Sequence, residues 1–130
     1  MGPDAAWLDL VREEAIDPAR PIVDPHHHLW DRRTFRYLLD EMLADTGSGH
    51  NVTATVFVQC AAMHRADGPV HLRPVGETEF VNGIAAMSAS GAYGPTRVAA
   101  GIVGHADLRL GAAVAEVLEA HLTVARERFR

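Results

Sequence analysis

Short apolar runs alternate with stretches of helical periodicity along this chain, and this alternation is the feature that most restricts its fold. Three runs, at residues 22–28, 52–60 and 98–104, carry β-branched residues and are bounded by Gly, Pro or polar residues, as strands are. Apolar residues at helical spacing follow the runs, at 35–44, 76–90 and 111–126. A strand followed by a helix, three times over, predicts an α/β fold with a parallel sheet covered by helices.

The spacing of the predicted strands fits two architectures. Strand starts near residues 22, 53 and 98 suit a (β/α)8 barrel, which uses about 31 residues per unit, if one connecting loop is enlarged. The same starts suit a doubly wound sheet. In either architecture the last predicted strand would leave an edge without a partner. We therefore expect these 130 residues to form part of a domain.

Residues 1–20 predict a helical extension before the barrel-like part at 21–130. Asp4 is placed to cap a helix, and a shared apolar face would contain Trp7, Leu8, Val11 and Ala15. No cationic region precedes an apolar stretch at the N-terminus, and no segment approaches 18 consecutive apolar residues. The sequence therefore predicts neither a signal peptide nor a membrane span, and we expect a cytoplasmic protein without a membrane partner.

The charge and cysteine content exclude several classes of function. The basic residues are 12 arginines with no lysine, against 17 acidic residues, so the net charge is −5 and no basic face for nucleic acid is expected. Cys60 is the only cysteine, which excludes an internal disulfide framework and a cysteine-rich zinc site. Any metal would have to be held by histidine and carboxylate side chains.

Three consecutive histidines end the first predicted strand, in the stretch IVDPHHHLWD at 22–31. Residues two apart in a strand project to the same side, so His26 and His28 can converge on one metal ion, with His27 directed away from them. Asp24 would lie on the same face, to accept an imidazole N–H or to bond the backbone. From the residues alone two interpretations stay open: a metal or catalytic site, or hydrogen-bonded polar residues at a strand end.

Together with the later stretches TVFVQC, RPVGETEFVNG and GIVGHADL, this histidine motif resembles the amidohydrolase-related branch of the amidohydrolase superfamily. That branch includes 2-pyrone-4,6-dicarboxylate lactonase and related hydrolases and decarboxylases. The resemblance extends from about residue 20 to the end of the chain. It implies the first three βα units of a (β/α)8 TIM barrel, incomplete here, in which His26 and His28 match the strand-one pair that binds a divalent metal, usually Zn²⁺.

The resemblance also implies residues that have no counterpart in this sequence. Such barrels use further histidines from later strands and an aspartate from strand eight that ligates the metal or acts as a base. We therefore interpret the chain as an N-terminal portion, a fragment whose remaining catalytic residues lie beyond Arg130. The last residues, ERFR, resemble the approach to the next strand.

Three further side chains are candidates for binding a substrate. Arg32 and Arg36 lie in the loop after the first strand, where a guanidinium can clamp a substrate carboxylate, although solvated loop charges are the alternative. His105 follows the third predicted strand and can line the mouth of a barrel, although a hydrogen-bonded histidine at a strand end is the alternative. Glu77 and Glu79 open a predicted helix, where acidic residues are favoured electrostatically, and we assign them no chemistry.

The resemblance therefore implies a hydrolase, present here as a truncated chain, that acts on a small carboxylated carbonyl or lactone substrate with the help of a metal. A metal-independent lactonase, in which His26 and His28 donate hydrogen bonds, and a metal-dependent decarboxylase of the same family stay open. The alternative from another class is an inactive truncation or a partner-dependent half barrel that associates with itself through open sheet edges. A doubly wound binding module has little support, because no glycine-rich phosphate loop follows the first strand.

Overall fold

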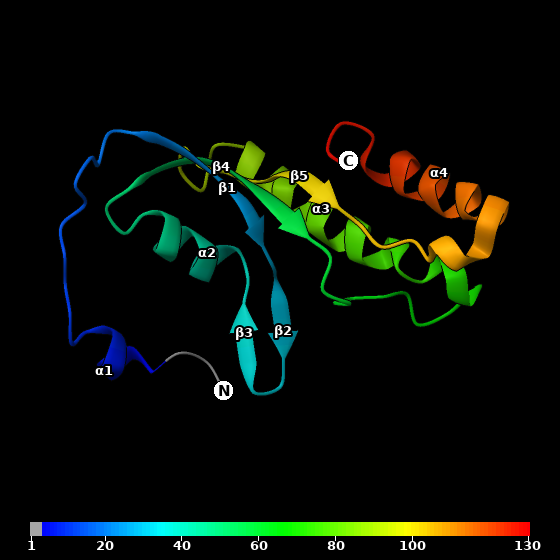
Figure 1. The fold of residues 1–130 in the computed structure, drawn as a ribbon, viewed down its shortest axis with the longest axis horizontal. Helices are drawn as coiled ribbons and strands as arrows, with labels where there is room; N and C mark the ends of the chain where they lie inside the picture. The colour runs from blue at the N-terminus through cyan, green and yellow to red at the C-terminus, as the bar shows by residue number, and fades with distance from the viewer. Residues whose placement is uncertain (1–3) are drawn as a thin grey trace.

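The computed structural model describes residues 4–130 as a mixed α/β arrangement, shown in Figure 1. The strands are β1 Pro21–His27, β2 Trp30–Arg32, β3 Phe35–Tyr37, β4 Asn51–Val58 and β5 Arg97–Val103. The helices are α1 Ala5–Leu8, α2 Leu39–Thr46, α3 Val75–Ala89 and α4 Val114–Ala125, with 3-10 turns at Val70–Leu72 and Leu108–Ala113. One sheet has the order β1-β4-β5, and β2 pairs with β3 in a separate hairpin.

The three predicted strands form the parallel sheet, which confirms the α/β fold class. The observed bounds of β1, β4 and β5 lie within two residues of the predicted runs. Both pairs are parallel: Pro21 lies opposite Asn51 in the first pair, and Phe57 lies opposite Ile102 in the second. The β-branched and aromatic side chains of these runs favour the pleated surface of a sheet, so their pattern predicts the strands.

A single hydrophobic core joins the sheet to three helices. Phe57 and Ile102 of the sheet are fully buried, and burial of each such side chain stabilises the fold by about 1.5–3 kcal/mol. The same cluster contains side chains from all three larger helices: Leu39 and Met42 of α2, Val81 and Ala85 of α3, and Ala125 of α4. Figure 1 shows α3 and α4 lying next to each other, and the Asn82 side chain donates to the Val124 carbonyl between them.

The opposite face of the sheet carries no helix within the described part of the chain. Val23 of β1 is 57% exposed and Val103 of β5 is 37% exposed, although both belong to strands of the central sheet. Such exposure of β-branched side chains along a sheet marks a surface that another layer of protein normally covers. The sheet therefore has one closed face and one open face.

The last residues of the chain add the beginning of a further strand beside β5. Phe129 forms a parallel bridge with Ile102. The Ile102 N–H donates to the Arg128 carbonyl at 2.8 Å, and the Arg130 N–H donates to the Ile102 carbonyl at 2.9 Å. The spatial order of parallel segments thus follows their order in the sequence, from β1 through β4 and β5 to residues 128–130.

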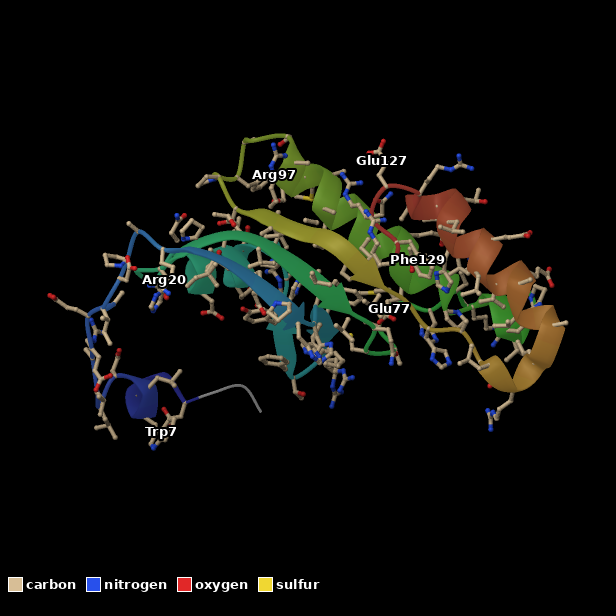
Figure 2. The ribbon with its side chains drawn as sticks, turned by 45° about the horizontal axis from the view of Figure 1, so that its top comes forward. Trp7, Arg20, Glu77, Arg97, Glu127 and Phe129 are labelled. Carbon is tan, nitrogen blue, oxygen red and sulfur yellow. The ribbon has the colours of Figure 1, made fainter. Side chains whose placement is uncertain are left out.

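The predicted N-terminal helix is much shorter than its apolar pattern indicated. Asp4 does cap it, because its carboxylate accepts the Ala6 N–H at 3.0 Å, but the helix ends at Leu8. Trp7 is 68% exposed and Val11 is 71% exposed, so the larger side chains of the predicted apolar face stay open to solvent in the described structure. Figure 2 shows Trp7 on the segment that leads away from the sheet. A short helix that buries no face has little to stabilise it in water.

The helix predicted at 35–44 begins later, because its first residues form a hairpin. Trp30 lies opposite Tyr37 and Arg32 lies opposite Phe35, in antiparallel register. The helix α2 then starts at Leu39, and the Glu41 carboxylate accepts the Leu38 N–H at 2.8 Å at its first turn. The aromatic residues at 35 and 37 fit the period of a strand as well as that of a helix, and pairing with the preceding residues decided the outcome.

The other two predicted helices are present with shifted starts. The helix predicted at 76–90 is α3. The helix predicted from Gly111 begins at Val114 instead, because Gly111 has a φ of 58° and interrupts the helical turns that start at Leu108.

Gly76 permits a close approach between the first turn of α3 and the loop after β4. A Cβ atom at Gly76 would lie 2.6 Å from the Met63 carbonyl oxygen and 2.7 Å from the Arg65 nitrogen. Both atoms belong to the backbone, so they cannot move aside as a flexible side chain can. Gly83, on the same helix, has nothing within 4 Å of its Cβ position.

We expect Gly76→Ala to lower the free energy of unfolding by about 1–3 kcal/mol, because the added methyl group forces the loop backbone away from α3. Gly83→Ala is the matched control and should raise the free energy of unfolding by about 0.5–1 kcal/mol, since alanine favours a helix interior. Urea denaturation of both variants measures the difference. Equal effects of the two substitutions would contradict the close approach.

Candidate functional site

His26 and His28 converge at the carboxyl end of β1. Their Nε2 atoms lie 3.3 Å apart, and their rings meet edge to face with centroids 4.9 Å apart. His26 is exposed and His28 is partly buried. The sequence predicted this convergence from the period of a strand, and the structure brings the two imidazoles together as predicted.

A hydrogen bond to the neighbouring strand sets the tautomer of His28. The Nδ1 atom of His28 lies 2.7 Å from the Val58 carbonyl oxygen of β4, and a carbonyl can only accept. Nδ1 therefore carries the proton, and in the neutral ring Nε2 presents its lone pair toward His26. Metal-binding histidines generally donate their second ring N–H in this way, which fixes the ring orientation.

The spacing of the two Nε2 atoms matches that of two ligands on one metal ion. Nitrogens at about 2.0–2.1 Å from a tetrahedral Zn²⁺ lie roughly 3.3–3.4 Å from each other. The observed separation is 3.3 Å. Two imidazoles supply half of a tetrahedral ligand set, and the described residues contain no group of three or more His, Cys, Asp or Glu side chains that could hold a metal ion. The pair fits a divalent metal as part of a larger set of ligands.

Asp24 does not join the pair, which corrects the expectation that it shares their face. Its carboxylate accepts the backbone N–H of His26 at 3.0 Å. Together with His27 it lines a hollow between β1 and α2. The register between β1 and β4 shifts between Asp24 and His27, so the simple alternation of side chains fails there. Asp24 therefore orients the backbone just before the pair and forms no hydrogen bond with either imidazole in the described structure.

His27 points into the core on the helix-covered side of the sheet. It is 7% exposed, its Nε2 lies 2.9 Å from Thr55 Oγ1, and its ring packs edge-on against Phe57. Thr55 Oγ1 also accepts the Ala99 N–H at 2.9 Å, so its own proton is free to donate to His27. Burial lowers the pKa of His27 below 6.5, which keeps the ring neutral.

Glu77 is a buried carboxylate that sequence reasoning left without a role. It is 1% exposed, and its Oε1 accepts the N–H groups of Cys60 at 3.0 Å and of Ala62 at 2.7 Å. These donors belong to the loop after β4, in which Ala61 and Met63 both have positive φ angles. Glu77 thus holds a strained loop at the carboxyl end of the sheet, and no pattern around it in the sequence distinguishes it from Glu79.

Cys60 is a partly buried thiol that packs against the hydrophobic core. Its Sγ lies 3.4 Å from Glu77 Oε1 and 3.6 Å from the Leu29 carbonyl oxygen. Burial, followed by the nearby Glu77 carboxylate, raises the pKa of Cys60 to about 11. The thiol therefore stays protonated near neutral pH and is a poor nucleophile.

The predicted substrate-binding residues fall in three different settings. Arg32 lies over the Trp30 ring, with its guanidinium carbon 4.1 Å from the ring centroid. Arg36 pairs with Asp40 at 3.5 Å and with Glu41 at 3.7 Å. His105 is exposed at the end of β5, and its carbonyl accepts a bond from His121 Nε2 at 3.0 Å. Arg32 is connected to the histidine pair through Trp30, whose ring centroid is 5.4 Å from that of His28.

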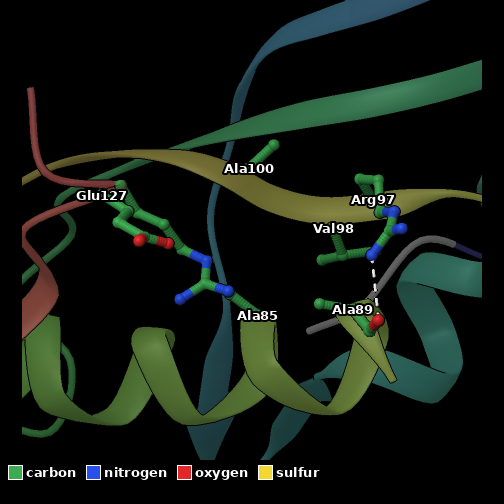
Figure 3. A pocket seen from close by; sticks show the side chains of 7 residues that line it. Ala85, Ala89, Arg97, Val98, Ala100 and Glu127 are labelled. Carbon is green, nitrogen blue, oxygen red and sulfur yellow. Dashed lines mark hydrogen bonds between the residues drawn. The ribbon is translucent and has the colours of Figure 1, made fainter. Parts of the chain in front are cut away.

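His105 borders a cavity of about 430 Å³ between the loops that precede α3 and α4. His71, Asp107 and Leu110 also line it, and Arg109 holds the pKa of Asp107 down to about 2. Figure 3 shows a second hollow, of about 230 Å³, between α3 and β5, where Arg97 donates to the Ala89 carbonyl at 2.9 Å. Neither cavity is lined by residues of β1 or its following loop.

Comparison with protein-family models, with curated proteins and with solved structures found no match for this chain. Among residues 4–130, no helix has the length and apolar character needed to cross a membrane.

We expect the free energy of unfolding to fall as the pH drops below 6.5. Burial lowers the pKa of both His27 and His121 in the folded protein, so the unfolded chain binds more protons in the acidic range. Their contribution is fully present above pH 6.5 and is lost toward lower pH, with a slope of up to about 1.4 kcal/mol per pH unit for each histidine. Urea denaturation from pH 7.5 to 5 measures this slope.

His27→Gln and His121→Gln should each flatten that slope, because one buried titrating ring is removed. His64→Gln is the control, since His64 is exposed in the loop after β4. A slope that is unchanged in both core variants would contradict the assignment.

We expect Glu77→Ala to lower the free energy of unfolding by about 1–3 kcal/mol for each backbone donor that it leaves unpaired. Glu77→Gln keeps a side-chain oxygen and should cost less. Glu79→Gln removes only the exposed ion pair with Arg65 and should change stability by about 0–1 kcal/mol. Urea denaturation compares the three variants, and a Glu77→Ala variant as stable as Glu79→Gln would refute the role of Glu77.

Proposed function

We propose that this chain forms the first βα units of a (β/α)8 barrel and carries the strand-one metal pair of an amidohydrolase-type hydrolase. Its substrate is a small carboxylated carbonyl compound or lactone. The observation that carries the proposal is the approach of His26 Nε2 to His28 Nε2 at 3.3 Å, at the carboxyl end of the first strand. Enzymes built on α/β barrels collect their reacting groups at that end of the strands.

The order of the strands supports a barrel more than a doubly wound sheet. In doubly wound sheets the strand order reverses at a switch point near the first strand. Here β4 follows β1, β5 follows β4, and Phe129 begins a segment on the far side of β5. All three larger helices pack on one face, which leaves the other face to line a barrel interior.

The residues of this chain prepare the pair for a metal. The Val58 carbonyl holds the proton of His28 on Nδ1, so that Nε2 is a ready ligand. Asp24 accepts the His26 N–H and orients the backbone at the second ligand. A divalent metal such as Zn²⁺, when bound, would polarise the substrate carbonyl and lower the pKa of water. The remaining ligands and the general base would come from later strands.

The same hydrogen bond argues against the metal-independent version. A neutral His28 whose Nδ1–H is bonded to Val58 has an Nε2 that can only accept, so it cannot donate to an oxyanion. Only a protonated ring, or the Nε2–H of His26, would supply such a donor. The geometry therefore favours the metal-assisted hydrolase.

The half-barrel alternative is supported by the open face of the sheet, where Val23 is 57% exposed. In that case the chain associates with itself or with a partner before it is stable. Sedimentation velocity and thermal melting separate the two proposals. A cooperatively melting monomer contradicts the half barrel, and a protein that melts only as a dimer or larger assembly supports it.

We expect the chain to bind Co²⁺, a spectroscopic substitute for Zn²⁺, through the histidine pair. Titration followed by visible absorption and by calorimetry should give about one ion per chain, and His26→Ala or His28→Ala should weaken binding at least about tenfold because each removes a ligand. His64→Ala, which removes an exposed loop histidine, should leave binding unchanged. Equal Co²⁺ affinity of the wild type and His28→Ala would eliminate the metal role.

A further inference from the structure

The hairpin after β1 has two chemically different faces. Residues opposite each other in an antiparallel pair point to the same side, so Trp30, Arg32, Phe35 and Tyr37 share one face. Asp31 and Arg36 share the other face. Arg36 is also paired with Asp40 and Glu41 of α2, so the charge on its face is balanced within the chain.

Arg32 keeps its charge available on the aromatic face. Its guanidinium lies over the Trp30 ring at 4.1 Å, and within residues 4–130 no carboxylate is within ion-pair distance of it. Stacking on an indole uses the flat face of the guanidinium and restricts the side chain. The N–H groups, which lie in the plane of the guanidinium, stay free to donate hydrogen bonds. A planar fork of this kind matches the two oxygens of a carboxylate.

Trp30 also connects Arg32 to the histidine pair. The Trp30 ring centroid is 5.4 Å from that of His28, so the guanidinium carbon lies within about 10 Å of the His28 ring. A small dicarboxylic or keto acid spans such a distance. A bound acid of that length can therefore extend from Arg32 as far as the His28 ring.

We propose that Arg32, stacked on Trp30, forms a carboxylate-binding subsite that selects small acids whose carboxylate lies a few bonds from the reacting carbonyl. The inference rests on the proposed hydrolase function for the identity of the reacting group. Binding of the carboxylate itself needs no metal, which makes the subsite testable separately. Trp30 is a positioning residue in this subsite, and Arg32 determines the specificity.

The fluorescence of Trp30 reports occupancy of this subsite. The sequence contains two tryptophans, and the other one, Trp7, is exposed. The substitution Trp7→Phe removes its fluorescence, so that Trp30 alone is observed. In this background and without metal, benzoate is titrated as the probe, and benzamide serves as its uncharged analogue. We expect saturable quenching by benzoate and none by benzamide, because the fork of Arg32 binds two carboxylate oxygens.

Arg32→Gln should weaken benzoate binding by about tenfold, since it removes the charge and half of the fork. Arg33→Gln is the matched control: Arg33 is the neighbouring arginine and is exposed in the hairpin turn, so its loss should change the affinity by less than about twofold. An equal loss in both variants, an unchanged affinity in Arg32→Gln, or equal quenching by benzamide would overturn the subsite. Failure of the Co²⁺ titration instead contradicts the metal-assisted reaction, so the two proposals fail separately.

Discussion

The pairing of β1 with β4 is the constraint on which the chemistry of this protein depends. Its register shifts between Asp24 and His27, and this shift decides which side of the sheet each polar residue occupies. His27 and Asp24 lie toward the helices, whereas His26 and His28 lie together at the strand end. The Val58 carbonyl of β4 then bonds His28 at 2.7 Å and sets its tautomer. One parallel ladder therefore positions the pair and determines which nitrogen is free.

Hydrogen bonds from buried polar side chains stabilise the strands and loops around the histidine pair. Thr55 connects the His27 ring to the Ala99 N–H, and Ala99 has a φ of 51° at the bulge between β4 and β5. Glu77 similarly connects the first turn of α3 to the loop after β4. In both places a side chain satisfies backbone donors that irregular strands or loops leave unpaired, which would otherwise cost free energy in the interior. These contacts explain why histidine, threonine and glutamate occur in a core that is otherwise apolar.

The hairpin after β1 gives the open end of the sheet its charge pattern. It places Trp30 beside His28 and Arg32 over Trp30. On its other face, Arg36 is paired with acidic residues of α2. The open sheet face, the pair of His26 and His28, and Arg32, which has no ion pair within residues 4–130, all lie outside the closed core. A surface that combines exposed β-branched residues with polar groups at a strand end is suited to contact a ligand or a further layer of protein.

The pattern of residues alone determined the three strands, the helix α3 and the convergence of His26 on His28. These features depend on periods of 2 and 3.6 residues, which are local properties of the chain. Tertiary structure decided the rest. The N-terminal helix ends at Leu8 because Trp7 and Val11 stay exposed within residues 4–130, and Phe35–Tyr37 joins a hairpin because β2 is available to pair. The place of Asp24, the burial of Glu77 and the stacking of Arg32 on Trp30 depend on strand register and loop packing between residues that are distant or ambiguous in sequence, and no local period encodes them.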